Sequence, residues 1–196
     1  MIICLTGGIG SGKSRAAAIL ESFGAYVLDL DDISRDVLAP HTPATMQVLD
    51  LWPDVGSDGV IDRKALADIV FSDAQAREAL EAIVHPAVWD EVDSRISQIH
   101  ELDEQAVIVL ELALLAGSSR ENWADMNLGI VADEDVRLER LERYRGMSAD
   151  EARARIAAQV SDSEIRELCD SVIDNSGTPE ELEEALSSFW SETVAA

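Results

Sequence analysis

The stretch LTGGIGSGKSR, residues 5–15, decides the fold class of this 196-residue chain. It overlaps the end of a short continuous apolar run, residues 2–6, which is typical of a strand buried on both faces. Residues 13–23 then carry apolar side chains at helical spacing, and Gly24 stands where a glycine commonly ends a helix. A second apolar run, residues 25–29, follows directly. This order of elements predicts a βαβ unit, and therefore a parallel sheet with helices on both faces.

The same stretch matches the pattern G-x-x-x-x-G-K-[ST] from Gly7 to Ser14. In that pattern backbone N–H groups surround phosphate oxygens, the lysine reaches the β- and γ-phosphates, and the hydroxyl binds Mg²⁺. The N-terminus of the following helix adds its positive end. We expect the nucleotide phosphates to be bound by Gly8, Ile9, Gly10, Ser11, Gly12, Lys13, Ser14 and Arg15, with Ser14 as the metal ligand. The alternative, a glycine turn that binds no nucleotide, is disfavoured by the strand and helix that flank the motif.

Composition narrows the class of partner. The formal net charge is −24, which disfavours nonspecific binding to nucleic acid or to an anionic membrane surface, since both are polyanions. Cys4 and Cys169 are too few and too far apart for a disulfide framework or a metal site. No apolar run is long enough to span a bilayer. We therefore expect a soluble, cytoplasmic, single-domain protein that takes a small substrate.

Three further apolar runs bring the expected strand count to five. They are residues 106–111, 128–133 and 171–174. Residues 32–102 carry few strand signals and read as a helical insertion, punctuated by Pro40, Pro53 and Pro86. Residues 53–62 are rich in turn formers and are expected to be a loop, and Ser72 is expected to cap the next helix. Capping boxes predict the starts of three later helices, at Ser148 with Glu151, Ser161 with Glu164, and Thr178 with Glu181.

Three aspartates, Asp29, Asp31 and Asp32, follow the second strand. Ligands of open α/β sheets bind at the carboxyl ends of strands, so a carboxylate here could accept the proton of an attacking hydroxyl. The alternative, equally favoured, is that Asp31 or Asp32 caps the helix that follows. Arg35, one turn further on, could hold an anionic substrate.

Six of the 15 basic residues fall between Arg137 and Arg155, and all six are arginine. Arg143 and Arg145 flank a turn between two helices, as expected of a lid that closes over a nucleotide and supplies positive charge. A salt-bridged helix face is the alternative, and Glu139 stands four residues before Arg143 in the favourable order. We favour the lid for Arg143 and Arg145 and the salt-bridged face for Arg137 and Arg140.

Two short segments carry weaker signals. His85 and Pro86 are expected between two helices, where the imidazole would more often cap the preceding helix than bind a substrate. The loop DNSG, residues 174–177, follows the last strand and could lie against an adenine ring, or be an ordinary turn.

The order of these blocks resembles the dephospho-CoA kinase family, which catalyses the last step of coenzyme A synthesis. LTGGIGSGKS is similar to that family's P-loop, and VLDLDDISRDVLAP to its D-x-D-x-x-x-R segment. DGVIDRKALADIVFSD with LEAIVHP resembles its substrate region, MSADEARARIAAQ its lid helix, and VIDNSG its adenine loop. The resemblance implies a P-loop NTPase kinase fold: a five-stranded parallel sheet flanked by helices, with a helical substrate-binding insertion (32–102) and an arginine lid (137–158) in one domain (1–196).

The resemblance also implies roles for individual residues. Asp31 would be the general base on the 3′-hydroxyl of dephospho-CoA, and Arg35 and His85 would shape the acceptor site. Asn175 and Gly177 would border the adenine of ATP. The negative charge that develops during phosphoryl transfer would be stabilised by Lys13, Arg143 and Arg145. Mg²⁺ would be bound to the ATP phosphates. We expect a monomer with dephospho-CoA as its partner, and neither nucleic acid nor membrane.

The chain departs from the family pattern in two places. The family's P-L-L-[FVY]-E is replaced by ALLAG, residues 113–117, so both the proline and the glutamate are missing; Glu111, just before it, is a possible substitute. The family's R-D-G in the lid is replaced by Tyr144, Arg145 and Gly146, which displaces the arginine to Arg143 or Arg145. These departures keep two alternatives open: a nucleoside or nucleotide kinase of the same fold, and a P-loop protein that binds nucleotide without catalysis.

Overall fold

The computed structural model describes residues 1–112 and 123–194. The chain divides into two compact units, one formed by residues 1–28 and 103–196 and the other by residues 29–102. The first unit contains the strands β1 (Ile2–Gly7), β2 (Tyr26–Asp29, whose last residue already belongs to the second unit), β5 (Ile108–Glu111), β6 (Met126–Val131) and β7 (Ser171–Asp174). Its helices are α1 (Lys13–Ser22), α6 (Glu134–Arg145), α7 (Ala149–Ala157), α8 (Asp162–Leu168) and α9 (Pro179–Thr193).

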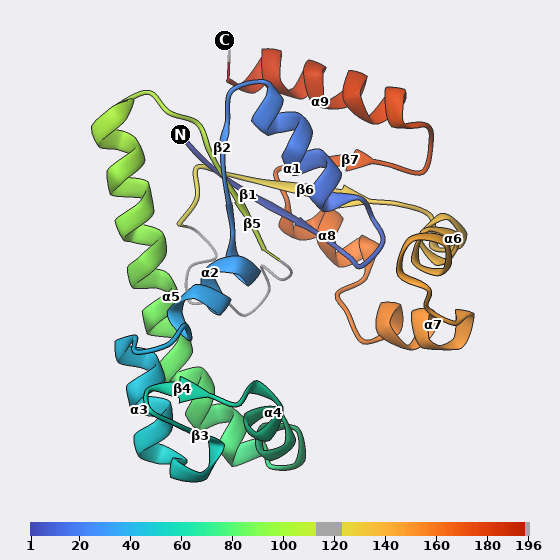
Figure 1. Ribbon diagram of the computed structural model, residues 1–196. Coiled ribbons are helices and arrows are strands. Elements are labelled where there is room, and N and C mark those ends of the chain that lie inside the picture. The colour runs from blue at the N-terminus through green and yellow to red at the C-terminus, as the bar shows by residue number, and fades with distance from the viewer. Residues whose placement is uncertain (113–122, 195–196) are drawn as a thin grey trace. The chain divides into compact units, whose positions relative to one another are not determined.

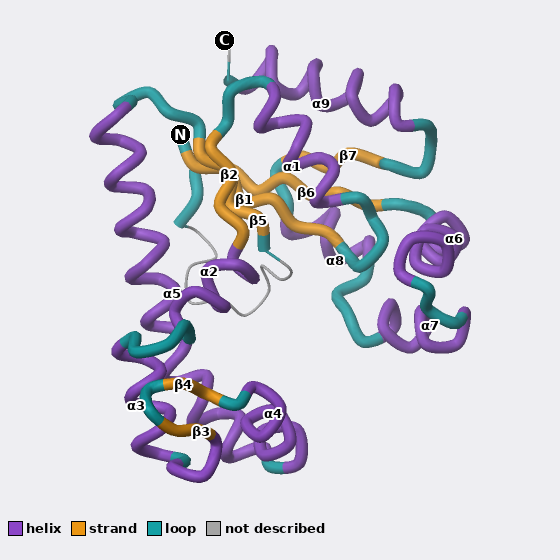
Figure 2. The backbone as a smooth tube through the Cα atoms, in the orientation of Figure 1, coloured by secondary structure: helices purple, strands orange, loops and turns teal. Residues whose placement is uncertain are grey.

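The five strands form one sheet in the order β2-β5-β1-β6-β7 (Figure 2). β1 lies in the middle and pairs in parallel with β5 on one side and β6 on the other, with Leu5 opposite both Glu111 and Leu128. The predicted five-stranded parallel sheet is thus confirmed. Parallel strands bring their carboxyl ends to one edge, so the segments after β1, β5, β6 and β7 meet there.

Helices cover both faces of this sheet (Figure 1). On one face α1 and α9 pack over the strands, and the core there includes Leu5, Leu20 and Leu186, all fully buried. On the other face α8 approaches β6 so closely that a Cβ on Gly129 would lie 2.7 Å from the Ile165 side chain. The glycine is therefore needed for this helix to reach the sheet.

The second unit is mainly helical, as predicted for residues 32–102. Its elements are α2 (Leu30–Val37), α3 (Pro43–Leu51), a 3₁₀ turn η1 (Pro53–Val55), β3 (Gly56–Ser57), β4 (Val60–Ile61), α4 (Arg63–Ser72) and α5 (Ala74–Leu102). Val48, Val55 and Leu66 form one of its buried apolar clusters. The expected loop over residues 53–62 contains the β3–β4 hairpin, whose turn residues Asp58 and Gly59 both have positive φ. Asp-Gly favours such a two-residue turn.

Two sequence expectations about this unit are wrong. α5 runs unbroken through Pro86, so His85 lies within a helix rather than between two, and caps nothing. Proline removes one helical hydrogen bond, but Val88 and Val92 beyond it are buried, and their packing keeps the helix continuous. Ser72 is the last residue of α4 and not a cap; the α5 N-terminus is capped by Asp73, whose carboxylate accepts from the Gln75 amide at 2.8 Å.

The helix-end signals in the first unit are otherwise confirmed. Ser161 and Thr178 form complete capping boxes at the starts of α8 and α9, and Gly24 follows α1 with a φ of 107°. Ser148 forms only half of one: it caps α7, but the Glu151 side chain turns to Arg155 instead. None of the helices in the described ranges is both long enough and apolar enough to cross a bilayer.

Candidate active site

The loop between β1 and α1 has the form of a phosphate cradle. Gly10 and Gly12 adopt left-handed backbone conformations, with φ of 79° and 94°, which residues with a side chain rarely adopt. The turn leaves the amide N–H groups of Gly10, Gly12, Lys13 and Ser14 without an acceptor among the described residues. Free N–H groups at the N-terminus of a helix bind phosphate oxygens. The geometry therefore fits the nucleotide-binding role that the motif predicts.

Glu111, at the end of β5, lies against this loop. Its side chain is buried, and the Ser14 hydroxyl donates to Glu111 Oε1 at 2.7 Å. Lys13 Nζ lies 3.9 Å from the same oxygen and donates to the Leu112 carbonyl at 3.0 Å. A hydroxyl and a carboxylate are oxygen donors of the kind that Mg²⁺ takes from proteins, with substrate phosphates and water as its other ligands. Ser14 and Glu111 together fit that ion.

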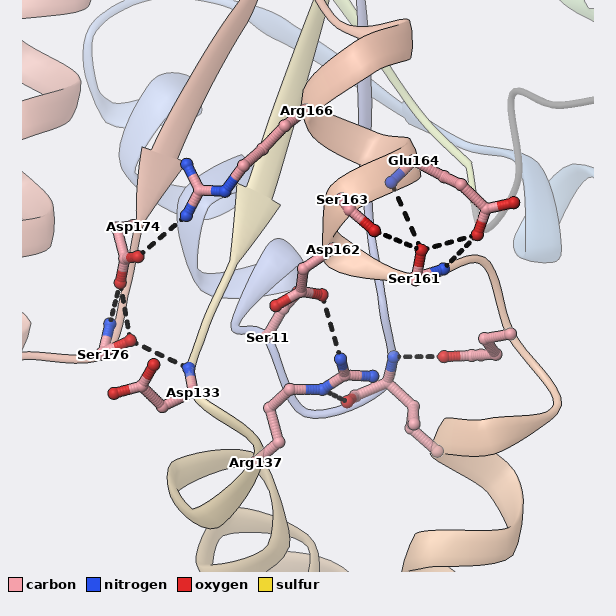
Figure 3. A network of polar contacts seen from close by, with 12 residues as sticks. Ser11, Asp133, Arg137, Ser161, Asp162, Ser163, Glu164, Arg166, Asp174 and Ser176 are labelled. Carbon is pink, nitrogen blue, oxygen red and sulfur yellow. Dashed lines mark hydrogen bonds and ion pairs between the residues drawn. The ribbon is translucent and has the colours of Figure 1, made fainter.

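Arg137 and Arg140, on α6, also reach the loop. Arg137 is almost fully buried; its Nε donates to the Ile9 carbonyl at 2.8 Å and its Nη1 pairs with Asp162 at 3.1 Å (Figure 3). Arg140 Nη1 donates to the Ser11 carbonyl at 3.4 Å. The salt-bridged helix face favoured from the sequence is wrong for these two, because their partners lie on other elements of the fold.

Asn175, after β7, braces the same loop. Its side chain is buried and donates to the Ser11 carbonyl at 2.7 Å, and a Cβ on Gly12 would overlap its Nδ2 atom. Gly177 is constrained by a different contact: a Cβ there would overlap the Glu181 carboxylate of the α9 capping box. Sequence reasoning placed both residues near a nucleotide base, and the structure gives each a local structural role.

A polar network fixes the loop that carries Asn175. The Ser176 hydroxyl donates to Asp174 at 2.6 Å and accepts from the Asp133 amide at 2.9 Å, which ties the ends of β6 and β7 together (Figure 3). Arg166 pairs with Asp174 at 3.1 Å. The hydrogen bond from Ser176, with a smaller contribution from Arg166, lowers the pKa of the Asp174 carboxyl below its usual range.

The two lid arginines predicted from the sequence stand on the last turn of α6. Arg143 and Arg145 are exposed, and neither has a carboxylate partner within residues 1–112 and 123–194; the Glu139–Arg143 pair does not form. The Arg143 guanidinium lies 5.4 Å from the centre of the Tyr144 ring. Gly146 then ends the helix with a φ of 62°. Both cations are therefore available to an anion.

Arg15, on the first turn of α1, is likewise exposed. Burial raises the pKa of the Cys4 and Cys169 thiols to about 11.

The acceptor residues predicted from the sequence lie in the second unit. Asp29 caps α2 by accepting from the amides of Asp31 and Asp32 at 2.8 and 3.4 Å, so the alternative that Asp31 or Asp32 is the cap is wrong. Asp32 pairs with Arg35 at 2.6 Å, on the exposed surface of α2. The exposed Asp31 carboxylate has no partner within the described part of the chain. His85 is exposed in the middle of α5, and ALLAG (113–117) lies outside the described residues.

Within this unit α2 is tied to α5 by Arg95. Its Nη2 pairs with Asp36 at 2.8 Å and its Nε with Glu91 at 2.7 Å, and these hydrogen bonds raise the pKa of Arg95. The helix that carries Asp31 and Arg35 is thereby held to the helix that carries His85.

The sequence did not place Arg137 or Arg140 at the P-loop, and it named Glu111 only as a possible substitute for the family's glutamate. The available signals were a carboxylate at the end of a buried strand and the concentration of arginines after residue 136. Neither signal names the loop that these side chains reach, because 97 to 129 residues separate the partners along the chain.

Comparisons with known proteins agree on one family. A family model described as dephospho-CoA kinase matches residues 1–181. A dephospho-CoA kinase of Frankia casuarinae is 40% identical over 193 residues, 97% of this chain and 82% of that protein. The dephospho-CoA kinase of Geobacter sulfurreducens is 39% identical and is covered to 96%, as is this chain. A solved structure from Thermus thermophilus is 36% identical with a TM-score of 0.83, covering 98% of this chain and 97% of its own.

Proposed function

The chain belongs to the dephospho-CoA kinase family, and from that premise we propose how its residues catalyse the transfer. The enzyme phosphorylates the 3′-hydroxyl of dephospho-CoA with ATP and yields coenzyme A and ADP. The observation that carries the proposed mechanism is the P-loop, whose free N–H groups adjoin the Lys13, Ser14 and Glu111 cluster.

ATP binds with its β- and γ-phosphates on the amides of Gly10, Gly12, Lys13 and Ser14. On ATP binding, Lys13 exchanges its contacts with Glu111 and the Leu112 carbonyl for phosphate oxygens, which are stronger partners for an ammonium group. Ser14 and Glu111 would hold Mg²⁺, which would neutralise phosphate charge.

The helical unit supplies the acceptor side, with Asp31 as the general base. Its carboxylate accepts the proton of the 3′-hydroxyl as the hydroxyl oxygen bonds to the γ-phosphorus and the bond to the β-phosphate oxygen of ADP breaks. The free Asp31 carboxylate supports this choice, since Asp29 is used as a cap and Asp32 is paired with Arg35. Arg35 and His85 shape the acceptor site, and Arg35 exchanges Asp32 for an anionic group of the substrate.

Arg143 and Arg145 form the mobile positive charge of the lid. Their exposure and lack of carboxylate partners in the described part of the chain leave both able to move onto the γ-phosphoryl group when ATP is bound. Positive charge placed there stabilises the transition state, in which negative charge spreads over the transferred oxygens. Asn175 and Gly177 border the adenine from the loop after β7.

One assay tests the activity against both alternatives. The enzyme is incubated with ATP and Mg²⁺ and, in parallel, with dephospho-CoA, a panel of nucleosides and nucleoside monophosphates, or water, while ADP is measured. We expect rapid ADP release with dephospho-CoA alone. ADP release with a nucleoside or nucleotide instead would identify a different kinase of this fold. ATP binding without any acceptor-dependent ADP would identify a protein that binds nucleotide without catalysis.

A further inference from the structure

Ile9 lies in the P-loop, and both its amide N–H and its carbonyl oxygen are hydrogen-bonded to side chains. Its amide N–H donates to Gln159 Oε1 at 2.6 Å, and its carbonyl accepts from Arg137 Nε at 2.8 Å. These partners lie 150 and 128 residues away along the chain. Arg137 stands in the first turn of α6, and Gln159 follows the end of α7. The helical hairpin that carries Arg143 and Arg145 therefore begins and ends on one P-loop residue.

The two glycines that flank Ile9 admit Arg137. A Cβ on Gly8 would overlap the Arg137 Nη2 atom, and a Cβ on Gly10 would lie 3.0 Å from the Arg137 carbonyl oxygen. Arg137 is 4% exposed, and its Nη2 has no hydrogen-bond partner among the described residues. Gly8 therefore leaves room for the buried guanidinium, and Gly10 leaves room for the Arg137 backbone.

Asp162 completes the arrangement. Its carboxylate pairs with Arg137 Nη1 at 3.1 Å, close in sequence to Gln159, so the two supports of Ile9 are joined to each other (Figure 3). A guanidinium that donates through Nε and Nη1 at once has a fixed orientation, which an ammonium group cannot reproduce. The Ile9 N–H is occupied by Gln159, whereas the next free N–H groups begin at Gly10. The clamp thus ends where the phosphate cradle begins.

We propose that Arg137 and Gln159 are positioning residues for ATP. They clamp Ile9 so that the free N–H groups of the loop stay aimed at the phosphates; these are the amides of Gly10, Gly12, Lys13 and Ser14. Neither side chain contacts the substrate in this role. The clamp also fixes both ends of the lid hairpin to the P-loop. Arg143 and Arg145 therefore approach the phosphates from a hairpin whose ends do not move. The inference rests on the proposed function only in taking ATP as the ligand of the P-loop.

The test compares two clamp variants with two matched controls. Gln159→Leu removes the acceptor of the Ile9 amide, and Gln105→Leu makes the same change at an exposed glutamine. Arg137→Lys keeps the positive charge but cannot make the two hydrogen bonds of the guanidinium, through Nε and Nη1. Arg95→Lys loses an equivalent pair of hydrogen bonds in the helical unit. We expect both clamp variants to weaken ATP binding measured by calorimetry about tenfold, the effect of about one lost hydrogen bond. Both controls should stay within about twofold of the wild type.

Two further readouts separate positioning from a general loss of stability. The KM for ATP should rise with the calorimetric Kd, while the KM for dephospho-CoA stays within about twofold. Hydrogen exchange of the Ile9 amide should become faster in Gln159→Leu and remain unchanged in Gln105→Leu. If Arg137→Lys fails to fold, Asp162→Asn takes its place, because it loosens the same guanidinium from the side away from Ile9.

The proposal is overturned if ATP affinity and Ile9 exchange are unchanged in Gln159→Leu, or if the KM values of both substrates rise together with a lower melting temperature. Calorimetric ATP binding needs no acceptor, so this test is independent of the kinase activity. A wild type that binds ATP but does not phosphorylate dephospho-CoA would end the proposed function and leave the clamp testable.

Discussion

The two sides of the proposed reaction are built in opposite ways. On the ATP side, Glu111, Arg137 and Asn175 are buried and bond to the P-loop across long stretches of chain. On the acceptor side, Asp31 and Arg35 are exposed on α2, and among the described residues they contact only the cap of that helix, a neighbour on it and α4. Fixed donors suit phosphates, because preorganised dipoles need no rearrangement when charge develops. Exposed side chains suit an acceptor that is bound afresh in each cycle.

This contrast separates activity from stability. A substitution among the exposed acceptor residues should change turnover without changing the free energy of unfolding, because no buried contact is lost. A substitution on the ATP side should change both, since it leaves buried polar groups without partners.

Asp31→Asn should lower kcat at least about 100-fold, the lower end for the loss of a general base, and leave the Kd for ATP unchanged. The amide is nearly the same size but cannot accept the hydroxyl proton at neutral pH. The matched control, Asp32→Asn, removes an exposed ion pair with Arg35 and should lower kcat less than about threefold. Steady-state kinetics and calorimetry measure both; near-normal turnover in Asp31→Asn would remove the base assignment and with it the proposed contrast.

Glu111→Gln should raise the Mg²⁺ concentration needed for half-maximal activity about 30-fold, within the range seen when one residue that supports a metal site is lost. It should also lower the melting temperature, because Lys13 loses its carboxylate neighbour and the buried amide is a poorer acceptor for Ser14. Because Glu111 is a buried residue of the ATP side, we expect the higher Mg²⁺ requirement and the lower melting temperature to occur together. An Mg²⁺ dependence identical to the wild type would show that Glu111 only braces the loop.

Much of the fold could be predicted from local sequence. Apolar runs of strand length, the G-x-x-x-x-G-K-[ST] spacing and the capping boxes each depend on residues within about one turn of each other, and the elements that they predict are confirmed. The interpretation went wrong at His85 and Pro86, where proline signalled a helix end. Buried side chains after the proline, such as Val88, override that signal, and a local rule takes no account of them.

The ATP site shows the same limit more sharply. Arg137 and Arg140 stand on a helix that is rich in glutamate, so local rules favoured a salt-bridged surface. Their partners, Ile9 and Ser11, come from the other end of the chain, and only the parallel sheet brings the two segments together. For Asp31 the sequence left open whether its carboxylate caps α2. The structure answers this, because the cap is Asp29 and the Asp31 carboxylate is not used for capping.

Arg143→Ala and Arg145→Ala test the lid, which belongs to the ATP side but is exposed like the acceptor residues. The variant that removes the acting arginine should lower kcat about tenfold, the loss of about one charge-assisted hydrogen bond. The melting temperature of both should stay close to that of the wild type, since neither arginine has a carboxylate partner in the described residues. Equal, small effects of both variants would mean that the lid contributes no charge to the transition state.

Asp29→Ala gives the smallest effect and separates the position of Asp31 from its chemistry. Losing an N-cap carboxylate should lower the free energy of unfolding by ~1 kcal/mol, as should Thr178→Ala at the α9 cap of the other unit. Urea unfolding measures both.

The two variants should differ in activity, because the Asp29 carboxylate holds the amide of Asp31, and freeing that turn disorders the base without removing it. We expect kcat to fall about threefold in Asp29→Ala and to stay unchanged in Thr178→Ala, since a group that spends part of its time misplaced acts only for the remaining fraction. Equal kcat values in the two variants would show that the acceptor side needs no fixed helix start, and that substrate binding alone orients Asp31.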